Sequence, residues 1–197
     1  MNKQMAVTLA KDVLLHLDKY RTVGFSGYCS GDIPDDLNSK LNWNAQRFIA
    51  KIEKNCGVCA LGSMFLSYIR KLDDVKVKDL TLQYNHHSKP IFRVERKGVL
   101  DFKLREIFSE KQLLMIESAF ERRSMCSNAP DNYDNSDWSK GFGYDRVPNY
   151  IAEAINFGRE FVEAKDRLQA IMQNIIANNG EFVPTNKSEN QTNSIKT

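Results

Sequence analysis

The sequence has no long apolar run. Its first twenty residues, MNKQMAVTLAKDVLLHLDKY, never continue far without a charged or polar side chain, so they contain neither the apolar core of a signal peptide nor a membrane span. We therefore expect the chain to work in the cytoplasm, with no membrane partner. Cysteine is also scarce: four thiols would permit two disulfides, but a reducing cytosol favours free thiols.

Net charge and histidine are in short supply as well. A formal charge of +3 over 197 residues is too small to predict a nucleic-acid partner from the total alone. Only three histidines are present, and the sequence contains no Ser-His-Asp order, phosphate-binding glycine loop, HExxH motif or second CxxC pair. These absences predict a protein that is not an enzyme and that holds no cofactor and no metal.

The remaining composition is that of an ordinary globular protein, with 42% hydrophobic and 27% charged residues. A chain of this length buries about 70% of the surface that its unfolded form exposes, which is enough for one self-supporting core. We expect a single domain over residues 1–183. The polar stretch at 184–197 has almost no apolar side chains and is predicted to be disordered.

Helical spacing of apolar residues dominates the chain and predicts a mainly α fold. Residues 5–20 and 41–52 give amphipathic helices, while residues 58–72 are unsuited to water on every face and form the central buried helix of a helical bundle. Ser109 followed by Gln112 is a capping box that starts another helix. From Asn149 to Ile176 the spacing predicts one long C-terminal helix of about 40 Å.

Three segments interrupt this pattern. Residues 21–39 are rich in Gly, Pro and Asp and predict a loop. Residues 75–98 alternate between apolar and polar side chains around a turn-forming stretch, which predicts a small β-hairpin insertion. Residues 125–148 have no periodicity and form a long loop, a kind of segment that is uncommon unless it binds something or is disordered.

The motif Cys56-Gly-Val-Cys59 raises three alternatives. A thiolate at a helix N-terminus would suit thiol-disulfide chemistry, but the residues before the motif read as helix rather than as the strand that such sites normally follow. Zinc would need two further ligands, and Cys29 and Cys126 lack close partners of their own. We favour the third alternative, in which both thiols are small packing residues on one stripe of the central helix.

Charge and aromatic residues mark a candidate ligand site. Residues 86–105 hold six cations against two carboxylates, a local charge of +4, and residues 131–145 hold one cation against four, a local charge of −3. Guanidinium groups match phosphate oxygens, and aromatic faces stack on bases. The predicted ligand-binding residues are Tyr84, Lys89, Arg93, Arg96, Lys97, Trp138 and Tyr144.

Three stretches of the sequence are similar to small proteins of bacteriophages and prophages that have no assigned activity. They are Cys56-Gly-Val-Cys-Ala-Leu-Gly-Ser-Met-Phe65, Phe108-Ser-Glu-Lys-Gln-Leu113 and the run Arg167–Pro184, RLQAIMQNIIANNGEFVP. The resemblance implies a bacterial cytosol as the place of work. It also implies an accessory role, in which the protein binds a host protein or sequesters a host nucleotide signal.

These observations lead to a ranked set of functions. The first is a non-enzymatic, phage-type accessory protein that binds and inhibits a host factor, such as a host defence component, and forms homo-oligomers through its long C-terminal helix. The second is a sponge that sequesters a phosphate-bearing, nucleotide-like small molecule. The third is a CxxC thiol-redox or zinc-binding protein. Nucleic acid is not an expected partner.

Overall fold

The computed structural model describes residues 2–19, 21–22, 29–32, 39–54, 56–72, 74–84, 90–94, 99–122 and 148–184, with only the backbone course described for 29–32, 52–54, 56, 81–84, 90–94 and 100. Its α-helices are α1 (Lys3–Leu15), α2 (Ile49–Lys54), α3 (Ala60–Lys71), α4 (Val99–Ile107), α5 (Glu110–Glu121), α6 (Asn149–Arg159) and α7 (Ala164–Ala177). Two 3-10 helices are η2 (Ala45–Phe48) and η3 (Val77–Asp79). The strands are β1 (Arg21–Thr22), β2 (Cys29–Asp32), β3 (Cys56–Val58), β4 (Thr81–Tyr84) and β5 (Pro90–Val94).

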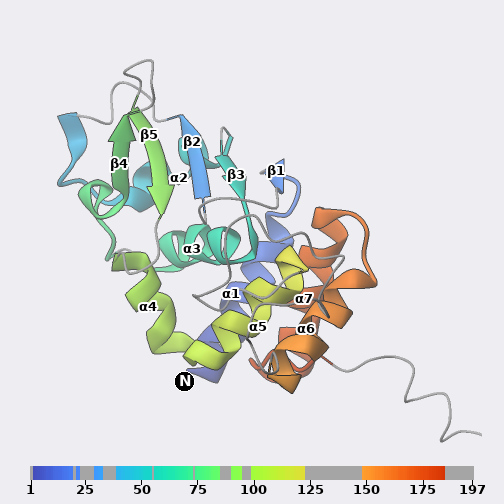
Figure 1. Ribbon diagram of the computed structural model, residues 1–197. Coiled ribbons are helices and arrows are strands. Elements are labelled where there is room, and N and C mark those ends of the chain that lie inside the picture. The colour runs from blue at the N-terminus through green and yellow to red at the C-terminus, as the bar shows by residue number, and fades with distance from the viewer. Residues whose placement is uncertain are drawn as a thin grey trace, which may run out of the picture.

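The prediction of a mainly helical fold is confirmed. In addition to the helices, the fold contains one sheet, which lies at one end of the molecule (Figure 1). Its strand order is β1-β3-β2-β5-β4, with β1 and β3 parallel and the other pairs antiparallel. The predicted hairpin is present as β4 and β5. It is not a separate insertion, however, because β5 also pairs with β2 and so forms part of the five-stranded sheet.

The segment 21–39, predicted as a loop, contains two of these strands. The residues of β2 include Ser30 and Gly31, which have little intrinsic preference for a strand. They become one because β2 lies between β3 and β5 and pairs with both, so that Ser30 is opposite Gly57 on one side and Arg93 on the other. Long-range pairing therefore overrides local preference here.

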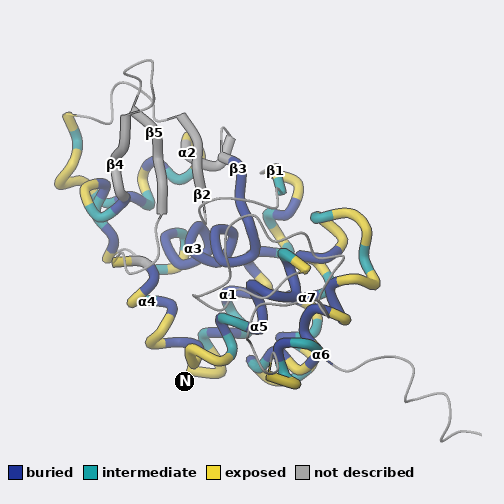
Figure 2. Tube along the Cα trace, viewed as in Figure 1, coloured by how far each residue is buried: buried dark blue, intermediate teal, exposed yellow. Residues whose placement is uncertain are grey.

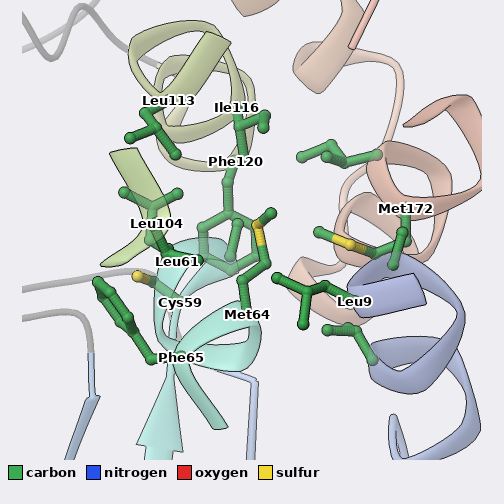
Figure 3. Close-up of a cluster of buried hydrophobic side chains, with 14 of the residues drawn as sticks. Leu9, Cys59, Leu61, Met64, Phe65, Leu104, Leu113, Ile116, Phe120 and Met172 are labelled. Atoms are coloured by element: carbon green, nitrogen blue, oxygen red, sulfur yellow. The ribbon is translucent and has the colours of Figure 1, made fainter. Parts of the chain in front are cut away.

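Helix α3 is the central helix of the fold, as predicted from its sequence. Every residue from Ala60 to Ile69 is buried, and Figure 2 shows the helix as a continuous buried segment beneath the sheet. Its apolar side chains face α5, with α1 and α7 alongside (Figure 3). Each large apolar side chain that is fully buried contributes about 1.5–3 kcal/mol, so α3 is a major source of the stability of the fold. The residues labelled in Figure 3 are Leu9, Cys59, Leu61, Met64, Phe65, Leu104, Leu113, Ile116, Phe120 and Met172.

Helix α5 begins where its capping residue predicts. Ser109 is the N-cap, and its side chain accepts a hydrogen bond from the Gln112 backbone N–H at 3.3 Å. The second half of the predicted capping box is not formed, because the Gln112 side chain instead bonds to the backbone of Phe182. At its other end α5 lies against α6, where a Cβ on Gly158 would be 1.8 Å from the Ala119 carbonyl oxygen. The two helices therefore meet at backbone distance.

The prediction of one long C-terminal helix is wrong. Helix α6 ends at Arg159 and α7 begins at Ala164, with no Gly or Pro between them to signal the break. The buried Arg167 supports it: its guanidinium donates to the carbonyls of Phe161 at 2.7 Å, Val162 at 2.9 Å and Phe120 at 2.7 Å. The carbonyls left over at the break are thus satisfied, as buried backbone groups require. The break removes the 40 Å helix on which the prediction of an oligomer depended.

Two further predictions concern residues that the structure does not describe. The loop at 125–148 lies outside the described residues except for Pro148, and so does the tail at 184–197 except for Pro184. The described helices include none with the length and apolar character needed to cross a membrane.

Candidate functional site

Trp43 is 48% exposed, a larger fraction than that of any other aromatic side chain among the described residues except Phe102 of α4, which is 58% exposed. Trp43 lies just before η2 on an irregular segment with firm backbone support. The Ala45 N–H donates to the Val75 carbonyl at 2.8 Å, and the Trp43 carbonyl accepts from the Val77 N–H at 2.9 Å. The Lys78 N–H donates to the Leu41 carbonyl at 2.9 Å. The segment is therefore held like a short strand against residues 75–78.

Two cations and a second aromatic ring surround Trp43. The Lys40 Nζ lies 5.9 Å from the ring centroid and the Arg47 Cζ lies 5.4 Å from it, both within the range of a cation–π contact. Phe48 packs behind, with its ring centroid 6.2 Å from that of Trp43, and is itself only 7% exposed. We call these four residues, Lys40, Trp43, Arg47 and Phe48, the Trp43 surface. It combines the exposed ring of Trp43 with the buried ring of Phe48 and the two positive charges of Lys40 and Arg47.

Side chains next to the Trp43 surface tie it to the rest of the fold. The Gln46 amide donates to the Arg70 carbonyl at 2.7 Å, which connects η2 to the last turn of α3. Asn44 accepts a hydrogen bond from the Lys76 ammonium, and the Asp79 carboxylate accepts from the Lys76 backbone N–H at 2.8 Å. Because these contacts fix the segment from both sides, the Trp43 ring is presented in one place rather than on a free loop.

The last turn of α3 is in turn fixed by a buried carboxylate from α1. The Asp12 side chain is 1% exposed, and it accepts from Arg70 Nε at 2.6 Å and from Lys71 Nζ at 2.9 Å. Burial opposes ionisation of Asp12, but the hydrogen bonds from Lys71 and Arg70 outweigh it and lower the pKa of that carboxyl. The carboxylate is therefore ionised at neutral pH and holds α1 against α3.

The surroundings of Trp43 are strongly basic. The segments 39–51 and 75–79 carry five cations against one carboxylate, a net charge of +4 that exceeds the charge of the whole chain. A positive surface of this kind attracts acidic partners and raises their rate of association. The charged residues of the two segments are Lys40, Arg47, Lys51, Lys76, Lys78 and Asp79.

This arrangement is suited to binding another surface. Trp and Arg are among the residues most enriched at interface positions that dominate affinity. The ring of Trp43 could also stack on a nucleotide base. A base would have to compete with Lys40 and Arg47 for the faces of the ring, whereas a partner protein can contact the ring and the cations together.

The CxxC motif is divided between a strand and a helix. Cys56 lies in β3, so the prediction that both thiols share one helix is wrong, because Cys56–Val58 pairs with both β1 and β2. Cys59 is the N-cap of α3, where its sulfur accepts from the Gly62 N–H at 3.5 Å. It is 5% exposed, and Figure 3 shows it pointing into the apolar cluster near Phe65 and Leu104. The prediction that Cys59 is a packing residue is confirmed.

Neither thiolate chemistry nor metal binding has support at Cys59. Burial raises the pKa of this thiol far above its usual range, and the hydrogen bond from Gly62 offsets this only in part. The thiol is therefore protonated at neutral pH, whereas the reactive form is the thiolate. Within the described parts of the chain, no group of three or more His, Cys, Asp and Glu side chains is placed to hold a metal ion.

The ligand-binding residues predicted from the sequence can be placed only in part. Tyr84 ends β4 opposite Pro90, and Arg93 lies in β5 opposite Thr81, three residues further back along β4. The two are therefore about 10 Å apart along the hairpin. Their side chains are outside the description, and so are the whole residues Lys89, Arg96, Lys97, Trp138 and Tyr144.

The Trp43 surface is absent from the sequence-based set of site residues. Periodicity assigned residues 41–52 to an amphipathic helix, in which Trp43 has no special place. A local signal was nevertheless present, since Lys40, Trp43 and Arg47 occur within eight residues that contain no carboxylate. The sequence alone could not predict the pairing with residues 75–78, which brings Lys76 and Lys78 next to this basic segment.

Comparisons with known proteins leave the function to be argued from this geometry. No protein-family model, no curated protein and no solved structure matches the chain.

Proposed function

We propose that this chain is a non-enzymatic binding protein whose Trp43 surface engages an acidic surface of a host protein. The observation that carries the proposal is an indole ring, 48% exposed, fixed by backbone hydrogen bonds and flanked by two cations. An exposed ring of this size offers a partner a large apolar area to cover. Because backbone hydrogen bonds already hold this segment, little conformational entropy is lost on binding, which favours affinity.

The chemistry of the partner follows from the charge of the site. Five cations against one carboxylate favour a partner that presents carboxylates around an apolar side chain. The apolar group would cover Trp43 while the carboxylates approach Lys40 and Arg47. The resemblance to phage accessory proteins makes a bacterial protein the natural partner, and inhibition of that protein is the outcome we propose for binding.

The test is affinity capture from a bacterial lysate with matched variants. Wild-type chain, Trp43→Ala and the double variant Lys40→Glu with Arg47→Glu are compared with Leu15→Ala, which removes a large apolar side chain that is 74% exposed on α1. A partner of the Trp43 surface is retained by Leu15→Ala and lost by the other two variants. Its capture also weakens as salt is raised, because salt screens the attraction between exposed charges.

Affinity measurement with the captured protein makes the test quantitative. Truncation of a central Trp costs at least about 2 kcal/mol at an interface, which is about thirtyfold in the dissociation constant. Circular dichroism of each variant establishes that it is folded. If wild type and Trp43→Ala capture the same proteins with the same affinity, the proposal is wrong.

The alternative function, sequestration of a nucleotide, is tested by a separate measurement. A ligand at about 100 times its dissociation constant stabilises a protein by about 2.7 kcal/mol, so a thermal-shift panel of mononucleotides and cyclic dinucleotides detects it. If a nucleotide raises the melting temperature of wild type but not that of Trp43→Ala, the Trp43 surface binds a nucleotide rather than a protein. A panel without any shift removes the sponge.

A further inference from the structure

The last described segment of the chain, Glu181–Pro184, is held in the way that a receptor holds an extended peptide. The side-chain amide of Gln112 on α5 accepts from the Phe182 N–H at 2.6 Å and donates to the Phe182 carbonyl at 3.1 Å. The Asn174 amide on α7 does the same for the next residue, accepting from the Val183 N–H at 2.8 Å and donating to its carbonyl at 2.8 Å. Both backbone groups of two consecutive residues are therefore bound by side chains from two different helices.

A single aromatic anchor fixes this segment to the helices. Phe182 is fully buried, with its ring edge-on to that of Phe157 on α6 at a centroid distance of 5.2 Å. The chain enters the segment through Gly180, whose φ of 96° is a conformation that L side chains rarely adopt. Glu181 forms an ion pair with Lys3 at 2.8 Å. The next side chain along, Val183, is partly exposed and contributes little burial.

A groove of about 400 Å³ runs beside the segment. Residues 181–184 form one side of it, and the N-terminal parts of α5 and α6 form the other. The Lys111 ammonium lies 4.6 Å from the centroid of the Tyr150 ring across this end of the molecule. The segment is therefore bordered by this groove on one side, while its residues Phe182 and Pro184 are buried.

We propose that α5, α6 and α7 form a binding site for an extended peptide with a Phe anchor, and that residues 181–184 of the same chain occupy this site in cis. Gln112 and Asn174 bind the backbone of the peptide, and the buried position beside the Phe157 ring accepts its Phe side chain. This division between backbone hydrogen bonds and a side-chain pocket is the usual basis of extended-peptide recognition. The inference is independent of the Trp43 surface.

Occupation in cis has a definite consequence for binding in trans. A tethered segment has an effective concentration in the millimolar range, so a separate peptide with the same contacts cannot displace it from the intact chain. Removing the Phe182 side chain weakens the binding of the tethered segment, so that a separate peptide can compete with it. A peptide added in trans should therefore bind to a variant that lacks the Phe182 ring, and it should not bind to the wild-type chain.

The experiment uses the full chain with Phe182→Ala and a capped peptide, acetyl-NNGEFVP-amide, which copies residues 178–184. At about 0.1 mM, well below the effective concentration of the tethered segment, the peptide should raise the melting temperature of Phe182→Ala and leave that of wild type unchanged. A peptide with Ala in place of Phe should have no effect on either. No response of Phe182→Ala to the Phe peptide would overturn the proposal.

Hydrogen exchange of the wild-type chain provides a test that does not depend on how well Phe182→Ala folds. The amide hydrogens of Phe182 and Val183 should exchange through local release, faster than those inside α5 and α7. Asn174→Ala removes one amide clamp from a partly exposed position, and it should speed exchange at Val183 without changing exchange within α5. If Phe182 and Val183 exchange only with global unfolding, the segment is an integral part of the core and the proposal is wrong.

The solution mass distinguishes a second copy as the occupant. If the segment of one chain filled the site of another, Phe182→Ala would lower the population of a dimer that forms with rising wild-type concentration. Such a result would support the site while moving its occupant from cis to trans. A monomer at every concentration, together with the peptide response, supports occupation in cis.

Discussion

Gly158 is the position where a single methyl group should have the largest effect on this fold. It lies in α6 against α5, and a Cβ built on it would be 1.8 Å from the Ala119 carbonyl oxygen and 2.7 Å from the carbonyl carbon. Both contacts are to backbone, so no side chain can rotate away. Reaching an ordinary contact of 3.4 Å means separating the two helices locally by the difference, 1.6 Å.

Two effects of Gly158→Ala oppose each other. Alanine is favoured over glycine inside a helix by about 1 kcal/mol, which stabilises the variant. Forcing packed elements apart costs about 1–3 kcal/mol, and the upper part of that range applies when backbone must move. The side chains that join α5 and α6 also lose contact as the helices separate. We expect a net loss of about 2 kcal/mol, which in a chain of this size lowers the melting temperature by about 4–8 °C.

Thermal and urea unfolding followed by circular dichroism measure this loss. The matched control is Asn156→Ala, which places alanine at an exposed position of the same helix and should leave stability unchanged or raise it slightly. If Gly158→Ala is as stable as Asn156→Ala, then α5 and α6 do not meet at backbone distance, and the packing described for this end of the molecule is incorrect.

Two further predictions concern buried ionisable groups. Asp12→Asn should cost about 3 kcal/mol at neutral pH because it leaves Arg70 and Lys71 without their carboxylate. The folded-state pKa of Asp12 is lowered, so this contribution is present above the ordinary pKa of about 3.9 and is lost as pH falls through the folded value. Urea unfolding of both proteins from pH 7 downward should show the difference shrinking, and a constant difference would refute the role of the charge. Cys59 should resist maleimide until the chain unfolds, because burial raises its pKa. Mass mapping in a Cys56→Ser background tests this, and rapid native labelling would contradict it.

Local sequence signals predicted the elements that local interactions determine. The Ser109 cap located the start of α5, and the absence of a polar face identified α3 as central. The break between α6 and α7 could not be predicted in this way, because it depends on Arg167 reaching carbonyls on two separate segments. For the same reason β2 was not predicted: its strand partners lie about 30 and 60 residues further along the chain.

The candidate site was harder to predict than the fold. The cations of the hairpin were predicted as the ligand-binding site. Of these, Arg93 lies in β5, and only its backbone is described. It did not find Trp43, because exposure of an aromatic ring is a property of tertiary structure. The segment that carries Trp43 is held by hydrogen bonds between residues 41–45 and 75–78, which are separated in the sequence by the whole of α3.

The position of α3 has a consequence for how ligands act on this protein. It contacts β2 and β3 on one side and α1, α4 and α5 on the other, so it connects the sheet to these helices (Figure 1). The strands and the helices should accordingly lose their structure in one step, as parts of a single cooperative unit. A molecule that binds at any one place, including the segment joined to the end of α3 through Gln46, would then protect the entire fold from unfolding and proteolysis.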